Sequence, residues 1–321
     1  MRNWTCLAAC GLMLIPVAAT AQEKFPARPL RILVGFGPGS GTDILAREVA
    51  LKMTDHWGQG VVVDNRPGAA AVIASEMLTR ATPDGHTLAI VSLGHAFNAS
   101  YLPKLPYDTL KDFAGISTVA DIPNVLVVAP ALKVKTMREL IDLVKSKPAQ
   151  FNFSSAGIGS AAHINGELFN QAAGVKVLHV PYKSMPEALT NTIGGNVQFV
   201  FASVSAAVAL IKSDKLVALA VSTKTRVPAL PEVPPMAEAG LPGFDFTAWY
   251  GFLAPAQTPA PVKNMLATEI ARIVALPDTK ERLLALGASP RPGTPAEFDA
   301  VIRQDVARFA ALIKATGIKA E

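Results

Sequence analysis

The sequence predicts an α/β protein that is divided into two lobes. The chain has 321 residues, which is more than a single domain of ordinary size requires. From residue 29 onward, short apolar runs alternate with segments of helical spacing. A strand, a loop rich in glycine and serine, and a helix follow one another near residue 30 and again near residue 151. We therefore expect a parallel sheet with connecting helices, and one such motif at the start of each lobe.

The N-terminus has the features of a secretory signal peptide. Arg2 supplies a positive charge, residues 7–19 form a short apolar run, and residues 19–21 are small enough for cleavage. We expect residues 1–21 to be removed by cleavage after Ala21, which places the mature protein in the periplasm. The apolar run is shorter than the roughly 20 residues of a membrane-spanning helix.

Cysteine content and charge exclude several classes of function. Cys6 and Cys10 both lie in the predicted signal, so the mature chain has no thiol for catalysis or metal binding. Lipid modification at Cys10 is the weaker alternative, because almost no apolar segment precedes it. The net charge is only +5, and the basic residues are scattered without interleaved aromatic residues. We therefore expect no binding of nucleic acid.

Strands are predicted where β-branched and apolar residues form short runs, and helices where apolar residues recur every three or four positions. The first part of the chain accordingly has predicted strands at 30–34, 61–63, 87–92 and 125–129, and predicted helices at 43–53 and 70–80. Pro83, Asp84 and Gly85 form the turn between the second helix and the third strand.

The middle of the chain continues the alternation. Thr136 and Glu139 form a capping box that opens a helix reaching about residue 146. Further strands are predicted at 151–153, 177–179, 197–201 and 216–220, and helices at 161–172, 186–193 and 204–212. Several prolines interrupt residues 226–243, so that this segment is expected to be irregular.

The C-terminal part is predicted to return to regular structure. A strand is expected at 244–253, and a capping box of Thr294 and Glu297 with Pro295 opens the last helix. Apolar residues then recur along one face of that helix, which we expect to be buried: Phe298, Ile302, Val306, Phe309, and Leu312 or Ile313.

The two glycine-rich loops are the candidate site. Residues 35–43 and 154–160 each connect a predicted strand to the N-terminus of a predicted helix. The first amide groups of a helix have no intrahelical acceptor, and the helix dipole adds positive potential there. Two such loops from two lobes would hold an anion. Asp43 would repel an anion, so we assign it mainly to capping the helix and organising the loop.

Enzyme functions fit the sequence less well. A dinucleotide fingerprint beginning at Gly35 or Gly37 fails, because Ser40 or Thr42 stands where a glycine is required. No nucleophile motif accompanies Ser160, and the histidines lack metal-ligand spacing. A nucleotide-dependent or hydrolytic α/β enzyme is thus the alternative. The sensor domain of a transcription regulator is a third class, but the signal peptide stands where a DNA-binding segment would be.

The order and spacing of many short motifs resemble a known family. These motifs include 38–43, Val63 to Ala69, Pro83 to Gly85, Ser154 to His163, His179 to Lys183, and Trp249 to Pro255. The chain resembles the periplasmic solute-binding components of tripartite tricarboxylate transporters, also called Bug or TctC-like receptors. Ala202 departs from the family, since many members have Asp after the residue at Phe201, and this weakens any inference of an amino-acid ligand.

The resemblance implies a Venus flytrap fold, type II-like, with two chain crossings between the lobes. Its expected limits are 22–122 and 245–321 for lobe 1 and 123–244 for lobe 2. It also implies a ligand carboxylate held by both loops, and delivery to a permease of one large and one small integral subunit. We expect a monomer that needs no cofactor or metal.

Several side chains are candidates for contact with the ligand. The candidates are Phe36, Gly39, Ser40, Gly41, Thr42, Asp43, His95, Ser154, Ser155, Gly157, Gly159, Ser160 and Ser203. Among them, Phe36, His95 and Ser203 could set specificity, as could Trp249 and Tyr250 near a predicted crossing strand. A dicarboxylate, a tricarboxylate and an aromatic acid are all compatible with the sequence.

Overall fold

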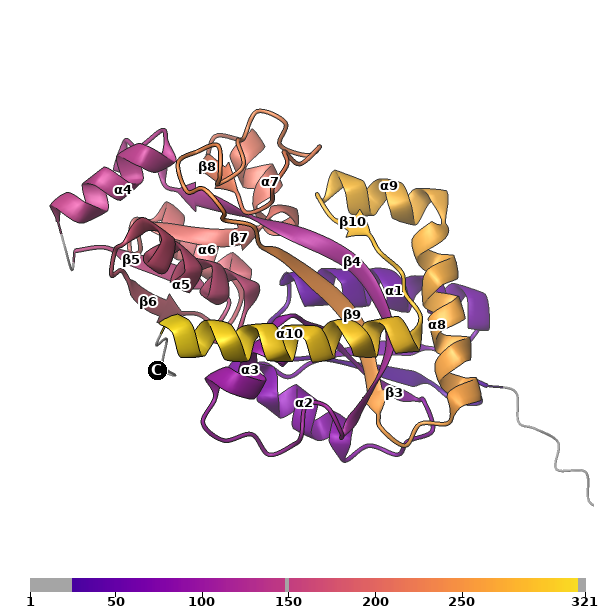
Figure 1. The fold of residues 1–321 in the computed structure, drawn as a ribbon. Coiled ribbons are helices and arrows are strands. Elements are labelled where there is room, and N and C mark those ends of the chain that lie inside the picture. The colour runs from indigo at the N-terminus through magenta and orange to yellow at the C-terminus, as the bar shows by residue number, and fades with distance from the viewer. Residues whose placement is uncertain (1–24, 148–149, 317–321) are drawn as a thin grey trace, which may run out of the picture.

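The computed structural model describes residues 25–147 and 150–316 and shows a two-lobed α/β protein (Figure 1). The predicted signal peptide, residues 1–21, and its cleavage site lie outside these residues. Within the described ranges, no helix combines the length and the apolar composition that crossing a membrane requires.

The first lobe is built on a parallel sheet. Strand β1 pairs in parallel with β2 on one side and with β3 on the other. Its strands and helices are β1 (Leu30–Val34), α1 (Gly41–Trp57), β2 (Val61–Asn65), the short helix η1 (Ala69–Ala71), α2 (Val72–Thr79), β3 (Thr87–Ser92) and α3 (Gly94–Tyr101). The helix α1 ends where Gly58 adopts a left-handed conformation and donates its amide to the carbonyl of Thr54.

The second lobe repeats the arrangement with parallel β5 between β6 and β7. Its elements are η2 (Pro130–Leu132), α4 (Met137–Ser146), β5 (Asn152–Ser155), α5 (Ala161–Ala173), β6 (Leu178–Pro181), α6 (Met185–Ile193), β7 (Phe199–Ser203), α7 (Val204–Lys212) and β8 (Val217–Val221). Residues 222–246 form no helix or strand, which confirms the irregular segment predicted at 226–243, but the strand expected from residue 244 begins only at Thr247.

Two long strands connect the lobes. Strand β4 (Phe113–Val128) pairs antiparallel with β9 (Thr247–Pro255), and they lie side by side through the middle of the molecule in Figure 1. The first part of β4 pairs with β9, whereas its last residues pair with β7 and β8 of the second lobe. The expected lobe limits at 122/123 and 244/245 therefore fall inside β4 and shortly before β9.

The C-terminal helices return to the first lobe. They are α8 (Ala260–Ala275), α9 (Pro277–Ala285) and α10 (Pro295–Thr316), with β10 (Ser289–Pro290) between the last two. The capping box that opens α10 is formed as predicted, because Thr294 accepts from the Glu297 amide and Glu297 accepts from the Thr294 amide. Phe298 and Phe309 are buried, and α10 extends from the first lobe towards the second (Figure 1).

Several local predictions need correction. Helices form at residues 94–101, 260–275 and 277–285 where none was predicted, and the crossing strand begins at Phe113 rather than at Val125. At α4, Thr136 accepts from the Glu139 amide as expected, but the Glu139 carboxylate accepts from the amide of Lys135 instead of Thr136. The capping box there is shifted by one residue and still supplies both hydrogen bonds.

Candidate functional site

The first glycine-rich loop presents the N-terminus of α1. Ser40 is the N-cap residue, and its hydroxyl accepts from the amide of Asp43 at 3.3 Å. Gly39 has a φ of +79°, which glycine adopts without strain. The amides of Gly41 and Thr42 precede the first residue with an intrahelical acceptor, so they are available to a ligand.

Asp43 holds this loop in shape as expected, but the capping role predicted for it belongs to Ser40. Its carboxylate accepts from the Gly39 amide at 2.9 Å, from the Asn65 side-chain amide at 2.9 Å, and from Arg47. Burial alone would raise the pKa of Asp43, but the hydrogen bonds from Arg47, Gly39 and Asn65 hold it below its usual value. Asp43 is thus ionised, and its charge is balanced by the protein's own donors.

The second glycine-rich loop presents the N-terminus of α5. Ser160 is the N-cap residue, and its hydroxyl accepts from the amide of His163 at 3.3 Å. The Ser155 hydroxyl accepts from the Gly157 amide at 3.0 Å and lies 2.7 Å from the His179 ring nitrogen. These bonds fix the loop, while the amides of Ala161 and Ala162, in the first turn of the helix, have no intrahelical acceptor.

The two helix N-termini meet at one small cavity between the lobes, which we call the inner cavity. Ser40–Thr42 of α1 and Ser160–Ala162 of α5 line it, together with Ser203, the N-cap residue of α7. Three helix dipoles therefore direct positive potential into the same space. Its volume of about 30 Å³ suits a group of the size of a carboxylate.

Three further polar side chains in the inner cavity come from strands. Ser92 ends β3, Asn124 lies in β4, and Tyr250 lies in β9. The Asn124 side-chain amide donates to the Phe201 carbonyl at 2.8 Å, while its oxygen has no partner among the described residues. Burial raises the pKa of Tyr250, so its hydroxyl keeps its proton and can donate it. Sequence reasoning did not assign Ser92 or Asn124 to the site.

A larger outer cavity of about 470 Å³ lies next to the inner one, and Phe36 and Ala156 line both. Its walls are residues 67–71 of the first lobe, with Gly35, and residues 156–158 and 181–183 of the second lobe. Sequence reasoning missed most of these walls, because the segments at 67–71 and 181–183 carry no chemical motif of their own.

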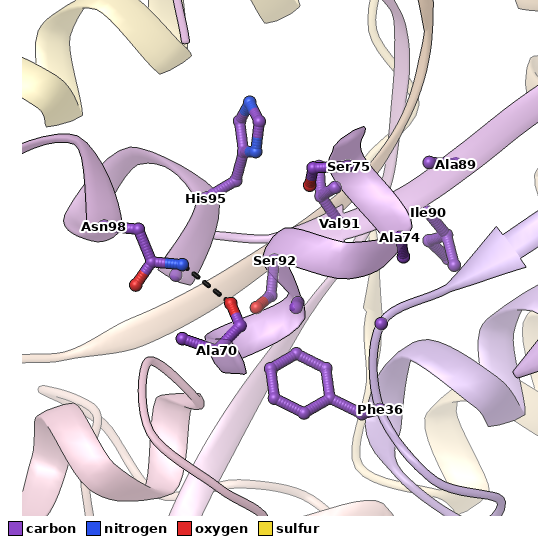
Figure 2. Close-up of a pocket in the computed structure, with 13 residues that line it drawn as sticks. Phe36, Ala70, Ala74, Ser75, Ala89, Ile90, Val91, Ser92, His95 and Asn98 are labelled. Atoms are coloured by element: carbon purple, nitrogen blue, oxygen red, sulfur yellow. Dashed lines mark hydrogen bonds between the residues drawn. The ribbon is translucent and has the colours of Figure 1, made fainter. Parts of the chain in front are cut away.

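A third cavity, the rear cavity, lies behind Phe36 within the first lobe (Figure 2). His95 lines this rear cavity and neither of the other two. Its ring lies edge-on to Phe113, and burial lowers its pKa to about 4. Asn98 also lines it and donates its side-chain amide to the Ala70 carbonyl at 2.7 Å, as Figure 2 shows.

The remaining candidates are distributed as follows. Ser154 is fully buried and hydrogen-bonded to Thr192, so it belongs to the core of the second lobe. Gly157 lines the outer cavity. Gly39 and Gly159 line neither cavity between the lobes: a Cβ atom on Gly39 would meet Pro186, and one on Gly159 would meet Asn98. Trp249 donates to the Asp305 carboxylate within the core.

The lobes are in direct contact around the inner cavity. The Gly37 amide donates to the Lys183 carbonyl at 3.2 Å, and a Cβ atom on Gly94 would come within 2.0 Å of the Gly159 carbonyl oxygen. The structure is therefore a closed form. No cluster of metal-binding side chains occurs in the part of the chain that is described.

Comparison with known proteins identifies the family. A family model described as "Tripartite tricarboxylate transporter family receptor" matches residues 45–318. The chain belongs to this family. The resemblance seen in the sequence is thereby confirmed, and the chain is a periplasmic solute-binding receptor of the TctC and Bug type rather than an enzyme.

Individual relatives match over nearly the whole chain. A UPF0065 protein in the tcbD-tcbE intergenic region of Pseudomonas sp. (strain P51) is 36% identical over 310 residues, covering 96% of this chain and 92% of the relative. The solved structure of the periplasmic binding protein BugD is 32% identical with a TM-score of 0.88, covering 92% of this chain and 100% of BugD. R. palustris Rpa4515 with adipate is 31% identical with a TM-score of 0.89, covering 92% and 99%.

Proposed function

We propose that this receptor captures a small carboxylate between its lobes in the periplasm and delivers it to a membrane permease of one large and one small integral subunit. The observation that carries the proposal is the inner cavity, where the N-termini of α1, α5 and α7 converge on a space of carboxylate size. The family name and the adipate in the R. palustris relative support the same assignment.

In this proposal the ligand is held by both lobes. The amides of Gly41 and Thr42 bind it from the first lobe, taken as residues 22–122 and 245–321. The amides of Ala161 and Ala162 bind it from the second lobe, taken as residues 123–244. Because the carboxylate contacts both lobes only when they are closed, its binding favours the closed form by its differential affinity.

A thermal-shift screen of the mature monomer tests the proposal. Each carboxylic acid in the panel is paired with its neutral primary amide, so that size and shape are matched while the charge differs. A ligand that binds only the folded state raises the unfolding temperature. At least one acid is expected to raise that temperature while its amide does not, and equal shifts for acids and amides would contradict the proposal.

Export and permease delivery have tests of their own. N-terminal sequencing of the protein recovered from the periplasm is expected to begin at Gln22, after the cleavage at Ala21. Uptake of the identified acid should require both the receptor and the permease, and uptake that persists without the receptor would contradict a role in delivery.

A further inference from the structure

The residues that line the outer cavity indicate the chemistry of the part of the ligand beyond its carboxylate. The inner cavity, at about 30 Å³, has room for a carboxylate and little else. The rest of the ligand then needs the neighbouring outer cavity of about 470 Å³, which Phe36 and Ala156 also line. The chemistry of the outer walls therefore selects among the acids that the helix N-termini would accept.

The wall contributed by the first lobe is apolar, and hydrogen bonds hold its backbone in an unusual conformation. Ala69, Ala70 and Ala71 have φ values of +45°, +58° and +68°, a left-handed conformation that costs energy for residues with a Cβ atom. Two hydrogen bonds hold this turn, from Asn98 to the Ala70 carbonyl at 2.7 Å and from the Ala71 amide to the Gly68 carbonyl at 3.0 Å.

Close packing beneath the turn holds it in place. A Cβ atom on Gly35 would come within 2.3 Å of the Ala71 methyl group, so only a glycine leaves room for the turn in this position. The methyl groups of this turn are thus fixed beside the Phe36 ring, which is itself buried. On the opposite side, Ile158 and Tyr182 of the second lobe complete the wall.

Charge is nearly absent from the two cavities between the lobes. Among the described residues that line them, Lys183 alone has a charged side chain, and it is exposed at the rim. No arginine lines either cavity. An ionised carboxylate that loses water without gaining a partner costs several kcal/mol, so a second carboxylate in the outer cavity would be disfavoured.

We propose that the ligand is an acid with one carboxylate and an apolar body, such as an aromatic ring, which packs against Phe36, the methyl groups of Ala70 and Ala71, and Ile158. This inference rests on the proposed function and narrows its ligand class. It separates this receptor from the relative whose structure holds adipate, a dicarboxylate. The cavity volume lies within the range of small-molecule sites, which are mainly apolar with few polar groups.

Isothermal titration with two series of acids tests the inference. The aromatic series is benzoate, phenylacetate and 3-phenylpropionate; the dicarboxylate series is succinate, glutarate and adipate. The tightest binder is expected to be aromatic, by about tenfold or more in Kd. The inference is overturned if a dicarboxylate binds as tightly or more tightly, or if no aromatic acid binds. Equal affinity for an aromatic acid and its amide would instead contradict the carboxylate site itself.

Two variants provide a second readout. Ile158→Asn places an amide in the apolar wall and is expected to weaken binding of the best aromatic acid about fivefold or more. Lys183→Gln removes the one charged side chain of the outer wall, and Lys176→Gln, at an exposed position outside both cavities, is its matched control, which should change that affinity less than about twofold. A selective loss of dicarboxylate binding of about tenfold in Lys183→Gln would show a second anion site and overturn the inference.

Discussion

The amide nitrogen of Gly37 lies 3.2 Å from the carbonyl oxygen of Lys183, and this hydrogen bond joins the first glycine-rich loop to the opposite lobe. Gly94 makes a second close contact between the lobes, because its Cα lies against the Gly159 carbonyl with no space for a side chain. Closure of the lobes therefore depends on glycines that the ligand does not have to touch.

Gly94→Ala is expected to prevent full closure. The added Cβ would be 2.0 Å from the Gly159 carbonyl oxygen, a contact that exists only when the lobes meet. The variant should bind the identified acid at least about tenfold more weakly. Small-angle scattering should show no compaction on addition of the acid, while the unfolding temperature without ligand stays near that of the wild type.

Gly60→Ala is the control for this variant, since nothing lies within 4 Å of its added Cβ. Normal compaction of Gly94→Ala on addition of the acid would refute the proposed role of Gly94 in closure.

Tyr250→Phe is expected to weaken ligand binding about tenfold, because hydrogen bonds to charged groups contribute about 1.5–3 kcal/mol. The Tyr250 hydroxyl lies over the start of α1, where a Cβ atom on Gly41 would come within 2.7 Å of it. Titration calorimetry measures the loss. Tyr107→Phe removes a hydroxyl that lines neither cavity between the lobes and should leave affinity unchanged. Equal effects of the two variants would show that Tyr250 has no direct role.

Asp43→Asn is expected to destabilise the folded protein by about 1–3 kcal/mol in urea unfolding. The substitution removes the charge that Arg47 pairs with at 3.0 Å and weakens the bond that holds the Gly39 amide. Asp55→Asn, at an exposed position of the same helix, should change the free energy of unfolding by less than about 0.5 kcal/mol. A similar small change in Asp43→Asn would mean that the loop keeps its shape without the ion pair.

Stability is expected to fall as the pH drops from about 6.5 to about 4. Burial lowers the pKa of both His95 and His179 to about 4, whereas the unfolded chain takes up these protons near pH 6.5. Acid therefore favours the unfolded state, by about 2 kcal/mol per histidine at pH 5. Urea unfolding at pH 7 and pH 5 measures the difference, which His95→Phe should reduce by about half. The same pH dependence in the variant would show that His95 titrates normally.

The helix caps and the irregular segment could be predicted because they depend on neighbouring residues. Thr136 and Thr294 cap their helices through bonds to residues three positions away, as predicted. The helix at 94–101 was missed because Leu93 precedes it and supplies no side-chain cap. The first half of β4 was missed because its order depends on pairing with the distant β9, with two register shifts along the way.

The two loops that would bind the carboxylate could be predicted from the sequence, whereas the apolar wall of the outer cavity could not. The loops at α1 and α5 can be recognised in the sequence because glycine and serine stand next to the start of a helix. Asn124 and Tyr250 reach the same cavity only because β4 and β9 cross between the lobes. The turn at 69–71 has a backbone conformation that its own residues disfavour, since alanine rarely adopts a positive φ. Only the packing against Gly35 and the hydrogen bond from Asn98 explain it.

A crystal structure with the tightest-binding acid of the panel tests the central claim most directly. The carboxylate is expected in the inner cavity, within hydrogen-bonding distance of amides at the N-termini of both α1 and α5. A carboxylate that contacts one lobe alone, or that lies at the rim of the outer cavity, would contradict the account.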